Sequence, residues 1–159
     1  MSGAVELVEI DDVVAAALRD GHATTLPLAS GFPRSEDLEA LRARERGALS
    51  YLIVTDGLVV GTCGSHGPPS VHDVVELGWG LVASARGRGV GTAAVTQLLE
   101  AATRRYPDAT IVAHTEWSDA GTGIVADSAA SEAMLERLGF SPEPEPIEPG
   151  YRAWRLVGG

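Results

Sequence analysis

The sequence contains no lysine and only one cysteine, and these absences exclude several kinds of chemistry. All 12 basic residues are arginine, so neither a lysine Schiff base nor a P-loop lysine is available. Cys63 cannot form an internal disulfide, and one cysteine with four histidines offers no zinc-ligand spacing. We therefore expect Cys63 to be a small core residue in a strand, and we expect no metal site.

Long apolar runs and a basic surface are also missing. No stretch approaches the roughly 20 apolar residues that span a bilayer, and the first residues lack a basic region followed by an apolar one. The formal net charge of −10 repels the phosphates of nucleic acids. These features predict a cytoplasmic protein that binds neither membrane nor nucleic acid. They favour an amine-bearing small molecule or peptide as the partner, and they leave a homodimer open.

Length and apolar periodicity predict a single domain, residues 1–159, with alternating classes of secondary structure. Asp56 and Gly57 separate two apolar runs and supply the positive φ angles of a tight hairpin. The order of elements implies an α/β or α+β sheet with helices on its faces. The expected elements are a strand at 4–10, a helix to residue 19, a helix at 35–46 capped by Ser35, strands at 49–55, 58–64 and 74–82, a helix at 89–106, a strand at 110–115, a helix at 128–138 and a strand at 151–157.

One segment carries the residues of an anion-binding site. Arg86-Gly87-Arg88-Gly89-Val90-Gly91-Thr92 lies between the end of a strand and the start of a helix. Unpaired backbone N–H groups and the positive end of the helix dipole converge there, and the glycines let a phosphate approach the backbone. The spacing fits neither the dinucleotide fingerprint G-x-G-x-x-G nor a P-loop. A glycine-rich loop without a ligand is the remaining alternative.

The flanking residues resemble a known family. Glu76-Leu77-Gly78-Trp79-Gly80-Leu81, followed by Arg86-x-x-Gly89-x-Gly91, is similar to the acetyl-CoA signature of GNAT acetyltransferases. Ser131-x-x-x-Leu135-Glu136-Arg137-Leu138-Gly139-Phe140 is similar to their second signature. The resemblance covers about Leu49 to Phe140 and is closest to the branch that contains the ribosomal-protein N-terminal acetyltransferases. It implies a mixed, mainly antiparallel central sheet with helices on both faces.

The resemblance also implies a cofactor and the residues that bind it. The cofactor is acetyl-CoA, and the reaction is transfer of its acetyl group to a primary amine by direct attack. Two positions depart from the family pattern: Ser128 stands where asparagine is common, and Leu135 where a tyrosine proton donor is common. The implied cofactor-binding residues are Leu81, Arg86, Gly87, Arg88, Gly89, Val90, Gly91, Thr92, Ser128 and Ser131.

A catalytic base and an acceptor site follow from local residues. On an unbroken strand Glu76 shares a face with Gly78 and Gly80, whose missing side chains are expected to leave backbone open to a ligand. Glu76 is the candidate base; a salt-bridged strand residue is the alternative. A non-catalytic acyl-CoA-binding module is the alternative for the whole chain.

The long segment after residue 115 is expected to contribute to acceptor binding. Trp117, Asp119 and Asp127 bring an aromatic face and two carboxylates there, and Glu116 adds a third acidic group. Such a site would favour a cationic amine or a peptide N-terminus over a neutral or anionic acceptor.

Overall fold

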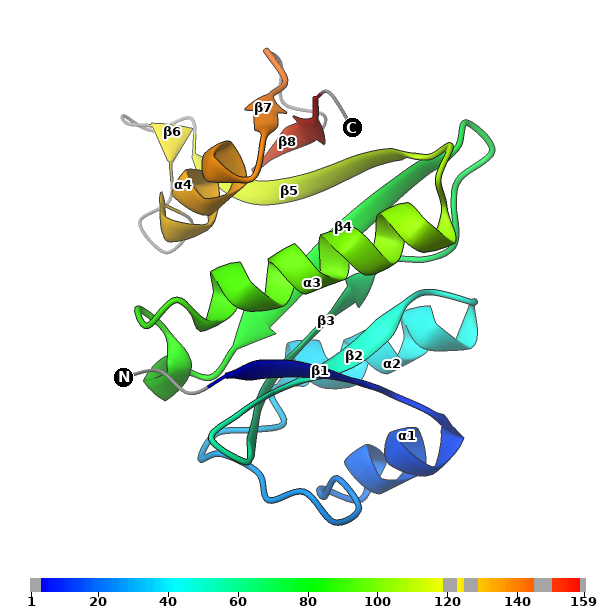
Figure 1. Ribbon diagram of the computed structural model, residues 1–159, viewed down its shortest axis with the longest axis vertical. Helices are drawn as coiled ribbons and strands as arrows, with labels where there is room; N and C mark the ends of the chain where they lie inside the picture. The colour runs from blue at the N-terminus through cyan, green and yellow to red at the C-terminus, as the bar shows by residue number, and fades with distance from the viewer. Residues whose placement is uncertain (1–3, 119–122, 125–128, 145–149, 158–159) are drawn as a thin grey trace. The chain divides into compact units, whose positions relative to one another are not determined.

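The computed structural model describes residues 4–118, 123–124, 129–144 and 150–157 (Figure 1). The chain divides into two compact units: unit 1 is Met1–Pro68 with Gly78–Pro107, and unit 2 is Pro69–Leu77 with Asp108–Gly159. Strand β4 therefore contributes to both. The elements are β1 (Val5–Glu9), α1 (Asp12–Arg19), α2 (Ser35–Glu45), β2 (Ser50–Thr55), β3 (Leu58–Ser65), β4 (Val74–Leu81), a 3-10 turn η1 (Ala83–Ala85), α3 (Val90–Arg105), β5 (Thr110–Ser118), β6 (Gly123–Ile124), α4 (Ala129–Arg137), β7 (Phe140–Pro142) and β8 (Tyr151–Leu156).

In unit 1 the strand order is β1, β2, β3 and the C-terminal half of β4. β1 pairs antiparallel with β2, and β2 pairs antiparallel with β3 through a two-residue turn. Asp56 and Gly57 form that turn with φ angles of 54° and 75°. The predicted hairpin is confirmed, because positive φ at both central residues gives a turn whose twist matches that of the flanking strands. Cys63 is buried in β3, as expected.

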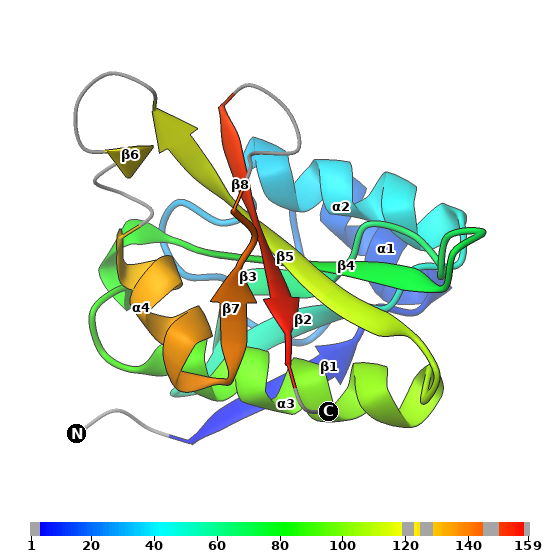
Figure 2. The same cartoon turned by 90° about the horizontal axis from the view of Figure 1, so that it is seen from above.

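Helices cover both faces of the unit 1 strands. Figure 2 shows α1 and α2 on one side of these strands and α3 on the other. α3 packs against β1 and β3 and buries a stripe of apolar side chains, while α2 packs against β2 and β3. Gln97 on α3 donates from Nε2 to the carbonyl oxygen of Val5 at 2.8 Å, which adds a polar tie to β1. The buried stripe of α3 consists of Val90, Ala94, Val95, Leu98 and Ala102.

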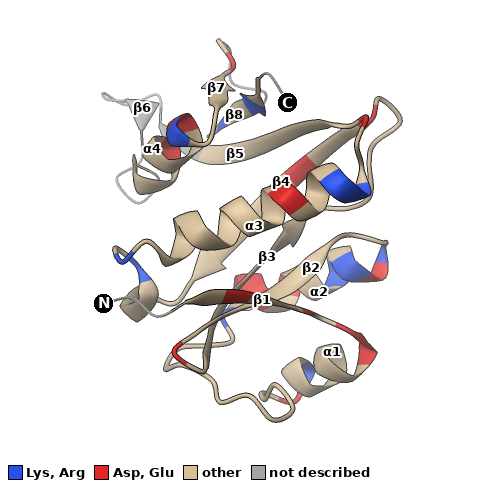
Figure 3. Ribbon diagram, viewed as in Figure 1, with Lys and Arg blue, Asp and Glu red and all other residues tan. Residues whose placement is uncertain are grey.

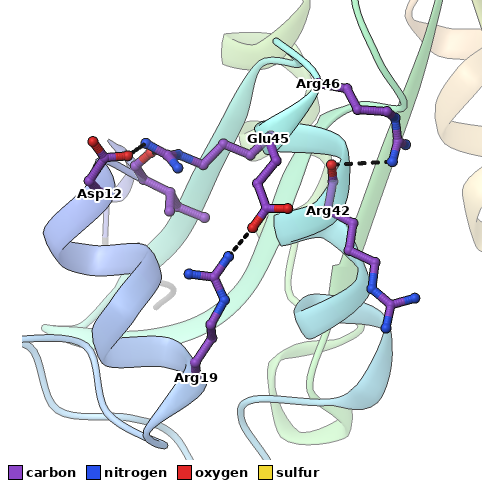
Figure 4. A network of polar contacts seen from close by, with 7 residues as sticks. Asp12, Arg19, Arg42, Glu45 and Arg46 are labelled. Carbon is purple, nitrogen blue, oxygen red and sulfur yellow. Dashed lines mark hydrogen bonds and ion pairs between the residues drawn. The ribbon is translucent and has the colours of Figure 1, made fainter.

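Arginine side chains tie α2 to α1 and to the end of β1 (Figure 4). Arg44 donates from Nε to the carbonyl oxygen of Ile10 and from Nη2 to Asp12, both at 2.6 Å. Arg19 and Glu45 form a second ion pair between the two helices. Such exposed pairs contribute at most about 1 kcal/mol each, so the helices are held mainly by their buried residues. The start of α2 differs from the prediction: its N-cap is Arg34 and not Ser35.

In unit 2 the N-terminal half of β4 pairs in parallel with β5, from Val74 opposite Thr110 to Leu77 opposite Ala113. β5 also pairs antiparallel with β8, and β8 with β7, while β6 lies beside β5. α4 packs against β7, and its Leu135 is fully buried. β7 is a strand that the sequence analysis did not predict. β5 extends beyond the expected residue 115.

Over the described residues the fold is mixed α/β, with a mainly antiparallel sheet and four α-helices, as predicted. β4 and β5 pair in parallel, whereas the pairs β1–β2, β2–β3, β5–β6, β5–β8 and β7–β8 are antiparallel. Among the described helices, none has the length and apolar character needed to cross a bilayer. Within the same residues, no three His, Cys, Asp or Glu side chains are grouped so that they could hold a metal ion.

Candidate functional site

The glycine-rich loop of unit 1 turns sharply before α3. Gly87 and Gly89 adopt φ angles of 75° and 78°, in the left-handed region that L side chains rarely occupy. Gly89 is the N-cap of α3. A Cβ atom built on either glycine would meet nothing within 4 Å, so the space beside the loop is open. The loop thus combines a left-handed backbone shape that glycine adopts freely with open space beside it, and both suit a backbone site for an anion.

Unused hydrogen-bond donors line this loop. In the described part of the chain, the backbone N–H groups from Gly87 to Thr92 donate to no protein atom, and the first bond of the helix runs from Ala93 N to Gly89 O at 3.1 Å. These groups lie at the positive end of a 16-residue helix. The side chains of Arg86 and Arg88 are exposed, and the loop is coloured as basic in Figure 3. The geometry suits a phosphate or pyrophosphate group.

The end of β4 is tied to the glycine-rich loop by a side chain of that loop. Arg86 donates from Nε to the carbonyl oxygen of Leu81 at 3.2 Å. Leu81 is buried, and a Cβ on Gly91 would lie 3.7 Å from its Cδ1, in ordinary contact. Val90 is 1% exposed and belongs to the core. Leu81 and Val90 can therefore reach a ligand only through their backbone atoms, whereas Arg88 can do so through its side chain.

The expectation that Gly78 and Gly80 leave the strand face open is wrong. A Cβ on Gly78 would lie 2.6 Å from Nε2 of His66. A Cβ on Gly80 would lie 2.7 Å from Cζ and 2.9 Å from Nη1 of Arg34, and would clash with Nη2. The missing side chains make room for two side chains from elsewhere in unit 1. The sequence does not predict the positions of His66 and Arg34, because the alternation of residues along β4 does not tell which side chains from other elements pack on it.

In unit 2 the candidate base lies beside a histidine. Nδ1 of His114 on β5 is 3.3 Å from Oε1 of Glu76 on β4, with both side chains partly exposed. The residues reach each other because β4 and β5 run in parallel, with Glu76 opposite Val112 and His114 two residues further along the same face. Carboxylate and imidazole side chains are both types that serve as general bases.

Other predicted site residues are placed or lie outside the description. Ser131 is half-buried on α4 in unit 2. Ser128, Asp119 and Asp127 are outside the described residues, and the side chains of Glu116 and Trp117 are not described. The acidic segment that is expected to bind a cationic acceptor therefore lies outside the described side chains.

Glu132, the residue after Ser131, is part of a buried polar cluster that no pattern in the sequence predicts. Glu132 is 4% exposed, and its Oε1 accepts from Thr115 Oγ1 at 3.2 Å. Thr115 Oγ1 in turn accepts from Trp154 Nε1 at 2.9 Å. The cluster fixes the start of α4 on β5 and β8.

Comparisons with known proteins identify the family and fold of the chain. Residues 8–141 match the family model "Acetyltransferase (GNAT) domain". A search of curated proteins found no match. Solved structures similar to the chain include a RimL ribosomal L7/L12 alpha-N-protein acetyltransferase, at 18% identity and a TM-score of 0.62 over 96% of this chain and 90% of the other.

Two further solved structures are similar in fold. An acetyltransferase from Agrobacterium tumefaciens is 20% identical with a TM-score of 0.61, covering 98% of this chain and 92% of the other. A spermidine N-acetyltransferase SpeG chimera from Vibrio cholerae and hSSAT is 10% identical with a TM-score of 0.65, covering 96% and 94%. These identities show a shared fold and no more. The family model, which spans most of the sequence, shows that this chain belongs to the GNAT acetyltransferases.

Proposed function

We propose that this chain is an acetyl-CoA-dependent N-acetyltransferase, acting as one domain over residues 1–159, that acetylates a primary amine of a small molecule or peptide N-terminus. Acetyl-CoA is the cofactor of the family, and one RimL structure similar in fold contains coenzyme A. The observation that carries the proposal is the row of unused N–H groups from Gly87 to Thr92 at the start of α3.

The residues of this loop fit the pyrophosphate of the cofactor. Gly87 and Gly89 offer space for two phosphate groups to approach, and the N–H groups of the first turn of α3 supply donors of the type that binds phosphate elsewhere. Arg88 adds a mobile positive charge in a strongly acidic chain. The proposed cofactor contacts are therefore the backbone of residues 87–92 and the side chain of Arg88, with Arg86 holding the strand end through Leu81.

The Glu76–His114 pair is proposed to take the proton from the acceptor amine. Acetyl-CoA supplies the acetyl thioester that the amine attacks. A lysine-like amine has a pKa near 10.4, so deprotonating it at pH 7 costs about 4.6 kcal/mol. Glu76 accepts this proton directly or through water, and Nδ1 of His114 lies 3.3 Å from its carboxylate. A leaving thiol with an ordinary pKa near 8.5 needs little assistance, so the buried Leu135 in place of a tyrosine is compatible with turnover.

Release of free thiol from acetyl-CoA, measured against a panel of primary amines, tests the proposal. Thiol release that depends on the amine, together with an acetylated product seen by mass spectrometry, is the expected result. Tight binding of CoA with no turnover on any amine would favour a non-catalytic acyl-CoA-binding module. No increase in melting temperature at millimolar CoA would remove the cofactor site altogether.

A further inference from the structure

Arg34 packs its guanidinium on the backbone of β4 at Gly80. The absence of a side chain at Gly80 is what admits it, since a Cβ there would lie 2.7 Å from Cζ and 2.9 Å from Nη1. Gly80 immediately precedes Leu81, the strand end that leads to the glycine-rich loop. All of these residues belong to unit 1. The guanidinium of Arg34 therefore lies on β4, the strand that leads to the glycine-rich loop with the proposed cofactor contacts.

A buried carboxylate holds Arg34 in this position. Asp37 is 1% exposed and accepts from Arg34 Nε and Nη2, both at 3.0 Å, and from the Arg34 backbone N–H at 2.9 Å. Thr62 of β3 donates to the same carboxylate at 2.5 Å. The hydrogen bond to Asp37 also raises the pKa of Arg34 above its ordinary value, so the guanidinium stays charged. Four contacts on one carboxylate fix the side chain more firmly than a surface ion pair would.

The guanidinium keeps donors for something else. A guanidinium has five N–H donors, and Asp37 uses one on Nε and one on Nη2. The remaining ones, including both on Nη1, donate to no residue in the described ranges. The side chain is 22% exposed, so a ligand can reach it although it is largely shielded from water. Hydrogen bonds made in such partly dehydrated surroundings are stronger than in bulk water.

The position of these donors indicates which ligand they meet. Arg34 lies where the side chain of residue 80 would point, which is toward a face of the sheet. Backbone groups that pair with an added strand-like ligand point instead along the plane of the sheet. The free donors of Arg34 therefore lie over the strand face, where they suit a ligand bound on that face better than one paired along the sheet. Guanidinium N–H groups require an oxygen acceptor and repel an ammonium group.

We propose that Arg34 is a specificity-determining residue that binds a carbonyl or carboxylate oxygen of the acceptor, so that amino acids or peptide N-termini are acetylated in preference to polyamines. A peptide carries a carbonyl next to the carbon that bears its amine, whereas a polyamine has no oxygen and only further cationic groups. This inference rests on the proposed function and names the acceptor class of that site.

A matched pair of acceptors tests it. Alaninamide and 1,2-diaminopropane share the carbon skeleton beside the amine, but the diamine has a second basic amine in place of the amide and so lacks the carbonyl oxygen. Because an amine next to a carbonyl has a pKa of about 8 and an alkylamine one of about 10, kcat/KM is compared per unprotonated amine. A short peptide with a free N-terminus extends the comparison. The wild-type protein is expected to acetylate the peptide and alaninamide with kcat/KM about tenfold or more above the diamine, the effect of one charge-assisted hydrogen bond. Equal or higher kcat/KM for the diamine would overturn the inference.

Variants of Arg34 locate the effect. Arg34→Gln is expected to raise KM for the peptide about tenfold or more and to leave KM for acetyl-CoA and for the diamine within about twofold, a small change by the same measure. Arg42→Gln, an exposed arginine of the same helix, is the matched control and should change none of these. If Arg34→Gln raises KM for acetyl-CoA as much as KM for the peptide, the oxygen that Arg34 binds belongs to the cofactor. That result would overturn the assignment to the acceptor.

Two precautions keep the test decisive. The double variant Arg34→Met with Asp37→Leu removes the donors without leaving a buried unpaired carboxylate, so it serves where Arg34→Gln folds poorly. Binding of the peptide to the CoA-loaded protein, followed by calorimetry, gives a readout independent of turnover. If no amine is acetylated, the proposed function fails; loss of peptide binding in Arg34→Gln would then still support the oxygen site, and no peptide binding to wild type would overturn it.

Discussion

His114 and Glu76 form a pair in unit 2, with Nδ1 of the histidine 3.3 Å from Oε1 of the carboxylate. The parallel register of β4 and β5 brings them together on neighbouring strands. This contact suits both a salt-bridged strand residue and a general base at position 76, because a carboxylate beside a histidine can still accept a proton. Variants at both positions separate a catalytic pair from a structural one.

Glu76→Gln is expected to lower kcat at neutral pH by about 100- to 10,000-fold, the usual contribution of general base catalysis. CoA affinity should stay within a few-fold, because the substitution touches the amine step and not the phosphate contacts. Steady-state kinetics together with a CoA melting shift measure both quantities. A loss in kcat under about threefold, far below that range, would return Glu76 to a purely structural role.

Two variants of His114 show which member of the pair takes the proton. Asparagine at position 114 keeps an N–H donor near the place of Nδ1, whereas alanine removes it. If His114 only orients Glu76, His114→Asn should retain most of kcat and His114→Ala should lose it. Equal losses in both variants would identify His114 itself as the base. The dependence of kcat on pH, recorded for each variant, adds a readout that a structural role would not change.

Gly91→Asp is expected to abolish the CoA melting shift. Gly91 lies in the first turn of α3, where an introduced carboxylate suits the helix dipole but occupies and repels the phosphate position. Circular dichroism should stay near wild type for the same reason. Gly91→Ala is the matched control, since its Cβ makes only an ordinary contact of 3.7 Å with Leu81. An unchanged melting shift in Gly91→Asp would place the cofactor elsewhere.

Asp37→Ala is expected to lower the free energy of unfolding by about 3 kcal/mol, near the lower end for breaking a buried ion pair, because Arg34 is partly exposed. Loss of Asp37 removes the partner of both Arg34 and Thr62. Urea unfolding followed by circular dichroism measures the change. Glu36→Ala, an exposed neighbour on the same helix, should change the free energy by less than about 0.5 kcal/mol. A similarly small change in Asp37→Ala would contradict the inference that Asp37 holds Arg34 in place.

Burial raises the pKa of the Cys63 thiol to about 12, so Cys63 should not react with iodoacetamide at pH 8 in the folded protein. It should react once urea unfolds the chain. Because the folded protein holds this proton more tightly than the unfolded chain does, the contribution to stability is complete below about pH 9 and is lost as the pH rises through about 12. Subtracting the unfolding curves of Cys63→Ala isolates this contribution. Rapid labelling of the native protein would contradict the burial.

The features that the sequence determined by itself depend on neighbours along the chain. Asp56 and Gly57 specify the hairpin because their backbone preferences select one turn type, and Gly87 and Gly89 specify the left-handed turns of the loop before α3 because that shape lies in the backbone. The apolar period of α3 is equally local. Family membership follows from these same segments, since their spacing carries the resemblance.

Only the tertiary structure decided what fills the space beside β4. Gly78 and Gly80 appeared open from the sequence, because strand alternation tells which residues share a face but not which side chains from other elements cover it. Arg34 appeared as an ordinary residue before a helix, although Asp37 three positions later was a signal for a cap at that residue. Its place on Gly80, like that of His114 beside Glu76, depends on long-range strand order and packing, which the local pattern of a single segment does not encode.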